Sequence, residues 1–368
     1  MRLLIVLPRR SATDRNIPNS VDLCVHDLVG ASRYRDSTCI VAERVHSLFD
    51  AFETADVPRF VAAHTALLAR YIARLAQARG ADLVVVHQHF QIAAGAARAL
   101  PGRVVFHAHG FYKSYPSTGL VSSIRRHLRL REIKRLAGLV HVSEACREAF
   151  ANSWPEVRIP QAVVHNGLDF TCWQPQHAKV QEILCVGRCV PEKGIAEAAQ
   201  AIVAALATQP GWRARFVLSE AERNPDYTGC VRNILTQSPV RDAVDIELNV
   251  PWQGIKERYE RAAIALVPSR WREPFGRTAL EAHAGGAALI SSGSGGLREV
   301  SGPHALFVDP TDSDGFTAAL LRLIGDDRLR DELARSGARY ARDRFSIASV
   351  AHGNDAFYES LLASRRTL

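Results

Sequence analysis

Short apolar runs alternate with longer amphipathic stretches along most of this chain. A first series of apolar runs predicts strands over 3–7, 37–42, 82–87, 103–109, 138–143 and 161–165. A second series follows over 182–187, 213–218, 244–248, 263–268 and 287–292. Apolar strands separated by helical stretches such as 58–77 are typical of parallel sheets covered on both faces. Two such series predict an α/β protein built from two doubly wound, Rossmann-like domains.

The turn-rich stretch 164–181 is typical of a linker between the two series, and 345–366 predicts a terminal helix. A length of 368 residues is also typical of two domains. We therefore expect an N-terminal domain over 1–166 that includes the C-terminal helix 346–368, and a second domain over 167–345. Ligands of open α/β sheets bind at the carboxyl ends of the strands, so we expect the site in a cleft between the sheets.

Composition narrows the class of protein. Hydrophobic residues make up 47% and charged residues 23% of the chain, and no apolar run approaches the ~18 residues of a membrane span. The opening MRLLIVLPRR reads as a first strand, since it is too short for a signal peptide. Seven scattered cysteines, an odd number, favour free thiols in a reducing compartment. We therefore expect a cytoplasmic protein.

The positive charge is concentrated in the first half of the chain. Residues 1–165 contain 22 Lys and Arg against 13 Asp and Glu, a net +9, whereas 166–368 contain 24 against 25, a net −1. Such asymmetry indicates an anionic surface or substrate that faces the first half. A basic face that is merely solvated is the alternative. Neither aromatic interleaving nor a known motif supports nucleic-acid binding.

One basic segment, 122–138, accounts for much of this excess. Apolar positions recur in it at roughly helical spacing among six cations: Arg125, Arg126, Arg129, Arg131, Lys134 and Arg135. A basic amphipathic helix can lie on an anionic membrane surface, which here would be the inner face of the cytoplasmic membrane. The alternative is a helix whose apolar residues pack inward while the basic ones are solvated.

The first strand of the second series leads into two cations. In ILCVGRCVPEKGI (183–195), Gly187 follows the strand as a turn residue, then comes Arg188, and Lys193 precedes the next helix. Both cations therefore lie at the carboxyl end of this strand. Arg by planar hydrogen bonding and Lys as a point charge suit a diphosphate. A loop in which Arg188 simply pairs with Glu192 is the alternative.

A pair of glutamates brackets a helix start in SRWREPFGRTALEAHAGG (269–286). Glu273 and Glu281 are eight positions apart, and the helix is predicted to begin near Pro274. Carboxylates accept hydrogen bonds from vicinal hydroxyls, and free backbone N–H groups at a helix start favour phosphate. These N–H groups belong to Phe275, Gly276 and Arg277. A second glycine-rich loop, with Gly295 and Gly296, can pass close to a ligand.

Several motifs occur together over the second domain: VHNGLD (164–169), VGRCVPEKG (186–194), EPFGRTALE (273–281), GSGGLREV (293–300) and LFVDPTD (306–312). In this order and spacing the chain resembles the retaining nucleotide-sugar glycosyltransferases of the GT-B fold, specifically glycosyltransferase family 4, the group 1 transferases. The resemblance implies the GT-B fold for this protein and a nucleotide sugar as its donor substrate.

The resemblance also implies roles for individual residues. Arg188 and Lys193 would neutralise the donor diphosphate, Glu273 would contact the transferred sugar, and Glu281 would hold the ribose. His109, in VVFHAHGFY (104–112), matches the active-site histidine near the donor sugar. The remaining donor-binding positions are the backbone at Gly187, Phe275, Gly276, Arg277, Gly295 and Gly296.

The acceptor side departs from the family pattern. Many members have a Gly-Gly loop after the first strand, where this chain has RRSATDRNIPNS (9–20). The candidate acceptor-side residues are Arg9, Arg10, Asn19, Tyr112, Lys113 and Ser143. The implied reaction needs neither a cofactor nor a metal. Among His87, His89, His107 and His109, no acidic partner stands at ligand spacing, so we expect no metal site there.

The expected function is retaining transfer of a hexosyl or N-acetylhexosaminyl group, with UDP-sugar favoured as donor over GDP-mannose. The acceptor is expected to be a hydroxyl of a glycan or lipid-linked molecule in cell-surface polysaccharide or lipopolysaccharide synthesis. A nucleotide-sugar epimerase or sugar phosphorylase of the same fold remains an alternative. A non-catalytic protein that binds nucleotide sugars is a further one.

Overall fold

The computed structural model of the chain describes residues 1–8, 19–43, 47–113 and 119–366. The chain divides into two compact units. Unit 1 comprises Met1–Gly167 and Ile347–Leu368, and unit 2 comprises Leu168–Ser346. These divisions lie one residue from the boundaries expected from the sequence.

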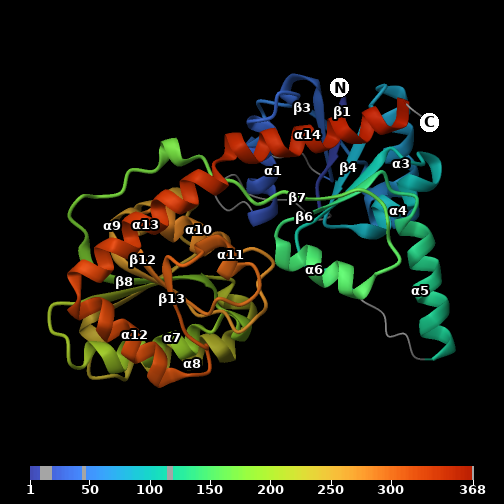
Figure 1. The fold of residues 1–368 in the computed structure, drawn as a ribbon. Coiled ribbons are helices and arrows are strands. Elements are labelled where there is room, and N and C mark those ends of the chain that lie inside the picture. The colour runs from blue at the N-terminus through green and yellow to red at the C-terminus, as the bar shows by residue number, and fades with distance from the viewer. Residues whose placement is uncertain (9–18, 44–46, 114–118, 367–368) are drawn as a thin grey trace. The chain divides into compact units, whose positions relative to one another are not determined.

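Unit 1 contains a seven-stranded parallel sheet in the order β3-β2-β1-β4-β5-β6-β7 (Figure 1). The strands β1, β2, β4, β5 and β6 are buried throughout because helices cover both faces of the sheet, whereas the edge strands β3 and β7 are not. The strands are β1 (Leu3–Val6), β2 (Thr38–Ala42), β3 (Glu53–Asp56), β4 (Leu83–His87), β5 (Val104–Ala108), β6 (Gly138–His141) and β7 (Gln161–Val163).

Helices α1 (Ser20–Gly30) and α14 (Ile347–Arg366) pack on one face of this sheet, where Val25 and Tyr358 meet Ile5 and Val85 in a common core. The C-terminal helix thus completes unit 1 although it follows unit 2 in sequence. The opposite face is covered by α2 (Arg59–Ala63), α3 (Thr65–Ala78), α4 (Phe90–Ala99), α5 (Leu120–Ile133) and α6 (Glu144–Ser153).

Unit 2 contains a six-stranded parallel sheet in the order β10-β9-β8-β11-β12-β13. Its strands are β8 (Val180–Arg188), β9 (Arg213–Ser219), β10 (Val244–Leu248), β11 (Ala262–Val267), β12 (Ala288–Ser291) and β13 (Ala305–Phe307). Its helices are α7 (Ile195–Leu206), α8 (Pro225–Thr236), α9 (Trp252–Arg261), α10 (Arg277–Ala284), α11 (Leu297–Ser301), α12 (Ser313–Gly325) and α13 (Asp327–Phe345).

The structure corrects several predicted elements. The stretch 58–77 is two helices, α2 and α3, because His64 adopts an extended conformation between them. Helix α5 ends at Ile133, although the basic segment was expected to be helical to 138. Strands β3 and β13 lacked an apolar run long enough to predict them. In the described part of the chain, no helix has both the length and the apolar character that crossing a bilayer requires.

Candidate functional site

The strand order of unit 2 reverses direction between β8 and β11. In doubly wound sheets, ligands bind at such a switch point, just beyond the carboxyl ends of the two neighbouring strands. The β8 end leads into the 3₁₀ turn η4 (Pro191–Lys193), and the β11 end leads into the loop with Ser269 and Glu273. The two motifs singled out in the sequence therefore meet at the position where this fold binds ligands.

The carboxylate of Glu273 is held by groups from both loops. Lys193 Nζ lies 2.5 Å from Glu273 Oε1, and the hydroxyl of Ser269 donates to the same oxygen at 2.7 Å. The Glu273 side chain is only 10% exposed and that of Lys193 22%. Two donors on one oxygen fix the orientation of a largely buried carboxylate. Ser269 was missed in the sequence, where its only signal is its place four residues before Glu273.

Backbone contacts keep these two loops together. The carbonyl of Glu192 accepts hydrogen bonds from the backbone N–H groups of Arg270 and Trp271, each at 3.0 Å. Gly194 has φ +66°, and a Cβ atom there would lie 2.0 Å from the carbonyl oxygen of Pro268. Only glycine allows this approach, so the position of Lys193 depends on the residue that follows it.

Arg188 is the last residue of β8, and its side chain is 53% exposed. Its Nη1 atom lies 3.7 Å from Glu220 Oε2, just after β9. Among the described residues it forms no ion pair with Glu192, the partner in the alternative interpretation of this loop. A half-exposed pair at this distance contributes about 0–1 kcal/mol. The guanidinium can therefore exchange Glu220 for an anionic ligand at little cost.

Helix α10 begins at Arg277, three residues later than the predicted start at Pro274. The reason is Gly276, whose φ of +114° is incompatible with a helix, while Phe275 is buried against Phe345 at 5.5 Å between ring centroids. The first N–H groups of a helix have no partner within the helix and carry partial positive charge, which favours anions. The role of this backbone toward phosphate stays a prediction.

Glu281 lies inside α10 and forms an ion pair one turn back. Arg277 Nε donates to Glu281 Oε1 at 2.9 Å, and the two side chains are 11% and 8% exposed. The family resemblance assigns Glu281 to a ribose, and its motif gives no sign of this ion pair. The carboxylate would have to hold a ribose while it also balances the charge of Arg277.

The glycines of this region divide into two kinds. Cβ atoms at Gly295 and Gly296 would lie 2.2 Å from the Glu273 carbonyl oxygen and 2.6 Å from that of Pro274. These glycines therefore allow two protein loops to approach each other. At Gly187, by contrast, the nearest atom to an added Cβ is Ile195 Cδ1 at 3.6 Å, an ordinary contact.

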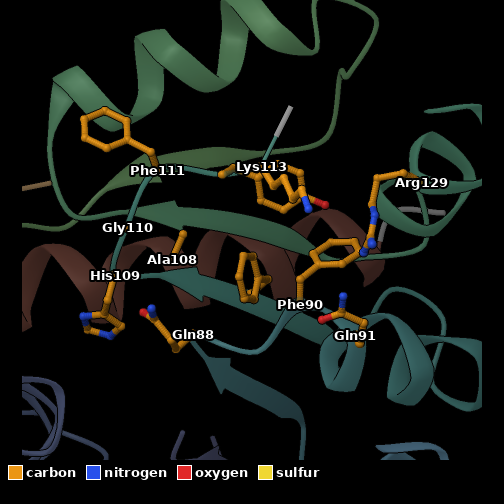
Figure 2. Close-up of a pocket in the computed structure, with 11 residues that line it drawn as sticks. Gln88, Phe90, Gln91, Ala108, His109, Gly110, Phe111, Lys113 and Arg129 are labelled. Atoms are coloured by element: carbon orange, nitrogen blue, oxygen red, sulfur yellow. The ribbon is translucent and has the colours of Figure 1, made fainter. Parts of the chain in front are cut away.

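In unit 1, three predicted residues line one cavity of about 210 Å³: His109, Tyr112 and Lys113. Figure 2 shows His109 and Gln88 at one end of this cavity and Phe90, Gln91 and Arg129 at the other. Gln88, the residue that follows β4, has φ +66°, which is rare for a residue other than glycine. The cavity joins amide, cationic and aromatic groups, which can bind a polar or anionic sugar.

His109 also belongs to a group of buried histidines. Its Nε2 atom lies 2.8 Å from His87 Nδ1, and its ring stacks on that of His107 with 4.6 Å between centroids. Burial lowers the pKa of His109 to about 4, so its imidazole is neutral at pH 7. Burial, and then the neighbouring His109, also keep the pKa of His87 well below its ordinary value.

Two other predicted acceptor-side residues cap helices. The Asn19 side chain accepts hydrogen bonds from the N–H groups of Val21 and Asp22 at the start of α1. The Ser143 hydroxyl, fully buried, accepts from the Cys146 N–H at the start of α6. These bonds give both residues a structural role, and their part in acceptor binding stays a prediction. Arg9 and Arg10 lie outside the described residues.

Known structures share this two-unit architecture. The structure of HepE from Anabaena in complex with UDP superposes with a TM-score of 0.77 at 18% identity, over 98% of this chain and 100% of that one. The protein therefore has the GT-B fold, which is supported by its two parallel sheets with covering helices and by its structural neighbours.

Family models account for most of the sequence. One described as "Glycosyl transferases group 1" matches residues 173–341, and one described as "Glycosyltransferase Family 4" matches 25–171. The chain belongs to the group 1 glycosyltransferases, family 4, as its motifs predicted.

Curated relatives of the chain include sugar transferases. A 241-residue stretch is 29% identical to MMP alpha-(1->4)-mannosyltransferase of Mycolicibacterium hassiacum and covers 64% of this chain and 57% of that protein. A 224-residue stretch is 25% identical to the lipopolysaccharide core biosynthesis mannosyltransferase LpcC of Rhizobium leguminosarum and covers 57% and 63%. The chain thus matches about 60% of the length of these relatives.

Proposed function

We propose that this protein transfers a sugar from a nucleotide-sugar donor, bound in unit 2, to a hydroxyl of an acceptor. The observation that carries the proposal is the switch-point site, where Lys193 and Ser269 hold Glu273. A buried carboxylate with a fixed orientation suits the hydroxyls of a sugar, and the nearby cations suit a diphosphate. Membership of the group 1 glycosyltransferases supports the same activity.

The proposed chemistry is retention of configuration by front-face attack. The bond between the anomeric carbon and the phosphate oxygen breaks, and the diphosphate leaves with the electron pair. The acceptor hydroxyl bonds to the anomeric carbon on the same face and gives its proton to the leaving phosphate. Arg188, Lys193 and the start of α10 stabilise the negative charge that develops on the diphosphate. His109 is assigned to the donor sugar by the family resemblance.

A hexose is the proposed transferred group. The two curated relatives are mannosyltransferases by name, which favours mannose, whereas the crystallised Anabaena neighbour binds UDP. We keep UDP-sugars as the first donors to test and GDP-mannose as the next. The cavity of unit 1, with Tyr112, Lys113 and Arg129, is the proposed acceptor region. Its cations favour an acceptor that has an anionic group.

Helix α5 is the proposed contact with an anionic membrane, and it supports an acceptor attached to a lipid. Val121, Ile124 and Leu128 are 62%, 52% and 53% exposed, so these apolar residues do not pack inward. Arg125 and Arg131 are exposed on the same helix. Arg126 and Arg129 are engaged instead with Glu156 and with the Phe90 ring. An apolar strip beside free cations is typical of a helix that lies on a lipid surface.

The activity is tested with a panel of UDP-, GDP- and ADP-sugars, first by thermal shift and then by product analysis with glycan and lipid-linked acceptors. We expect one nucleotide class to stabilise the protein and the sugar to appear on the acceptor with its anomeric configuration kept. Conversion of the nucleotide sugar without any acceptor would favour an epimerase. No stabilisation by any member of the panel would overturn the donor site.

The membrane contact is tested by sedimentation with vesicles of phosphatidylcholine and phosphatidylglycerol. Replacing Ile124 and Leu128 by Ser, or Arg125 and Arg131 by Ser, is expected to release the protein from anionic vesicles. Phe60→Ser is the matched control, because Phe60 is 70% exposed on a different helix of unit 1. Equal vesicle binding by all these variants would contradict the contact.

A further inference from the structure

Three imidazole rings from two neighbouring strands lie against one another inside unit 1. His87 ends β4, His107 pairs with it in register on β5, and His109 follows two residues later. Their ring centroids are 4.6 Å apart for His87 and His107 and for His107 and His109, and 5.1 Å apart for His87 and His109. One nitrogen from each ring lies within 4.8 Å of the other two.

The hydrogen bonds of this cluster are incomplete. His87 Nδ1 and His109 Nε2 share one proton across 2.8 Å. Both ring nitrogens of His107 are buried and have no hydrogen-bond partner among the described residues. A buried imidazole with no partner is costly, and it usually indicates a bound water or ion that satisfies it.

Contrary to the expectation from the sequence, we infer from this geometry that His87, His107 and His109 form a binding site for a transition-metal ion of the Zn²⁺, Co²⁺ and Ni²⁺ class. Neutral imidazole is the ligand these ions prefer, whereas Mg²⁺ and Ca²⁺ prefer oxygen. The ion takes the place of the proton shared by His87 and His109. The third nitrogen comes from His107.

The three side chains must turn about their χ angles to accept an ion, because the lone pairs of stacked rings lie in nearly parallel planes. Metal–nitrogen bonds of ~2.0–2.1 Å in a tetrahedral site set the ligand nitrogens ~3.4 Å apart, against the present limit of 4.8 Å. Rotation of the nearly parallel rings brings their lone pairs toward one point. No carboxylate or thiolate joins the three histidines in the described part of the chain. The ion therefore keeps its full charge, and water or an anion fills its fourth position.

A bound ion would occupy the nitrogen of His109 that faces His87. On the proposed function, which assigns His109 to the donor sugar, the ion is an inhibitor of sugar transfer. This step rests on the proposed function, whereas ion binding itself does not.

Cobalt absorption spectroscopy tests the site directly on the full chain. The exposed cysteines, Cys172 and Cys230, are first replaced by Ser so that thiolates do not compete for the metal. We expect one equivalent of Co²⁺ to give visible ligand-field bands without sulfur charge transfer, and Zn²⁺ to displace it. His107→Phe should abolish these bands, while His177→Phe, at an exposed histidine, should keep them. Absence of the bands, or their survival in His107→Phe, would overturn the site.

A second measurement covers the case in which His107→Phe does not fold. Zn²⁺ is added to crystals of the chain that keeps all three histidines, and anomalous scattering locates the ion. A peak between the three histidines supports the site, and peaks only elsewhere overturn it.

The inhibitory effect is tested on the transfer reaction itself. Zn²⁺ should lower the transfer rate at least tenfold, and a chelator should restore it, with Mg²⁺ as the inactive control. Full transfer with the site loaded overturns inhibition through His109 and leaves the metal site standing. If no sugar is transferred under any condition, the proposed function fails, while the cobalt spectra still decide the metal site.

Discussion

Lys193 and Glu273 are 80 residues apart in sequence, yet Lys193 Nζ lies 2.5 Å from Glu273 Oε1 at the carboxyl edge of the unit 2 sheet. The pair joins the loops that follow β8 and β11, the two strands on either side of the switch point. Both residues come from motifs assigned to the donor. A diphosphate near Lys193 would weaken this pair and leave the hydroxyl of Ser269 to hold the carboxylate.

Alanine substitutions at Gly187 and Gly194 distinguish a glycine that a ligand could approach from a glycine that protein packing requires. A Cβ atom at Gly187 meets only Ile195 at an ordinary 3.6 Å, so Gly187→Ala should change the free energy of unfolding by less than ~0.5 kcal/mol. If the donor approaches this backbone, its affinity should still fall at least tenfold. Urea unfolding and calorimetric titration give the two quantities, and unchanged affinity would remove Gly187 from the donor site.

Gly194→Ala should act through the fold. Its φ of +66° and the 2.0 Å approach to the Pro268 carbonyl oxygen leave no room for a methyl group. We expect a loss of at least ~2 kcal/mol in unfolding free energy, together with weaker donor binding, because the loop that carries Lys193 must shift. A stable variant with full donor affinity would show that this loop does not depend on the close approach.

Glu281 is expected to affect both stability and nucleotide binding. Glu281→Ala leaves the Arg277 charge buried without this partner, which typically costs about 3–5 kcal/mol. Glu281→Gln keeps the volume and an acceptor oxygen, and it is therefore the better variant for binding. This variant should bind UDP or GDP about tenfold more weakly and bind pyrophosphate as tightly as the unaltered chain does. An equal loss for pyrophosphate would mean that Glu281 acts through Arg277, and not on a ribose.

Acid should destabilise the protein through His283. Burial lowers the pKa of His283 to about 3 in the folded protein, against about 6.5 in the unfolded chain. Its contribution to stability is therefore complete above pH ~6.5 and falls by about 1.4 kcal/mol per pH unit as the pH drops toward 3. His283→Gln should flatten the pH dependence of the unfolding midpoint, while His177→Gln at an exposed site should not. Equal pH profiles for both variants would contradict this.

Much of the fold could be predicted because parallel strands buried on both faces are apolar throughout. The predicted strands at 3–7, 82–87 and 263–268 correspond to β1, β4 and β11. Strand β3, with the sequence ETAD, lies at the sheet edge, and it could not be predicted from an apolar run because both its ends are charged. Gly276 shifted the start of α10, since the sequence does not reveal a glycine's φ.

The site could be predicted only in part, because motifs identify residues and not their partners. Arg188, Lys193, Glu273 and Glu281 were recognisable, but the partners Ser269, Glu220 and Arg277 depend on how distant loops meet. The histidine cluster could be predicted only with knowledge of the order of the strands in the sheet. Alternation along the predicted strand 103–109 indicates that His107 and His109 share a face, while the contact with His87 requires β4 beside β5.

Calorimetric titration of the chain with UDP-glucose and GDP-mannose, in parallel with Lys193→Met, tests the donor site most directly. We expect one donor to bind at one site per chain, and Lys193→Met to weaken it by about 10²-fold or more, since a cation is lost from the diphosphate. Arg241→Met, at an exposed arginine of the same unit, should bind as the unaltered chain does. Binding of neither donor, or equal binding by Lys193→Met, would contradict a nucleotide-sugar site at the end of β8.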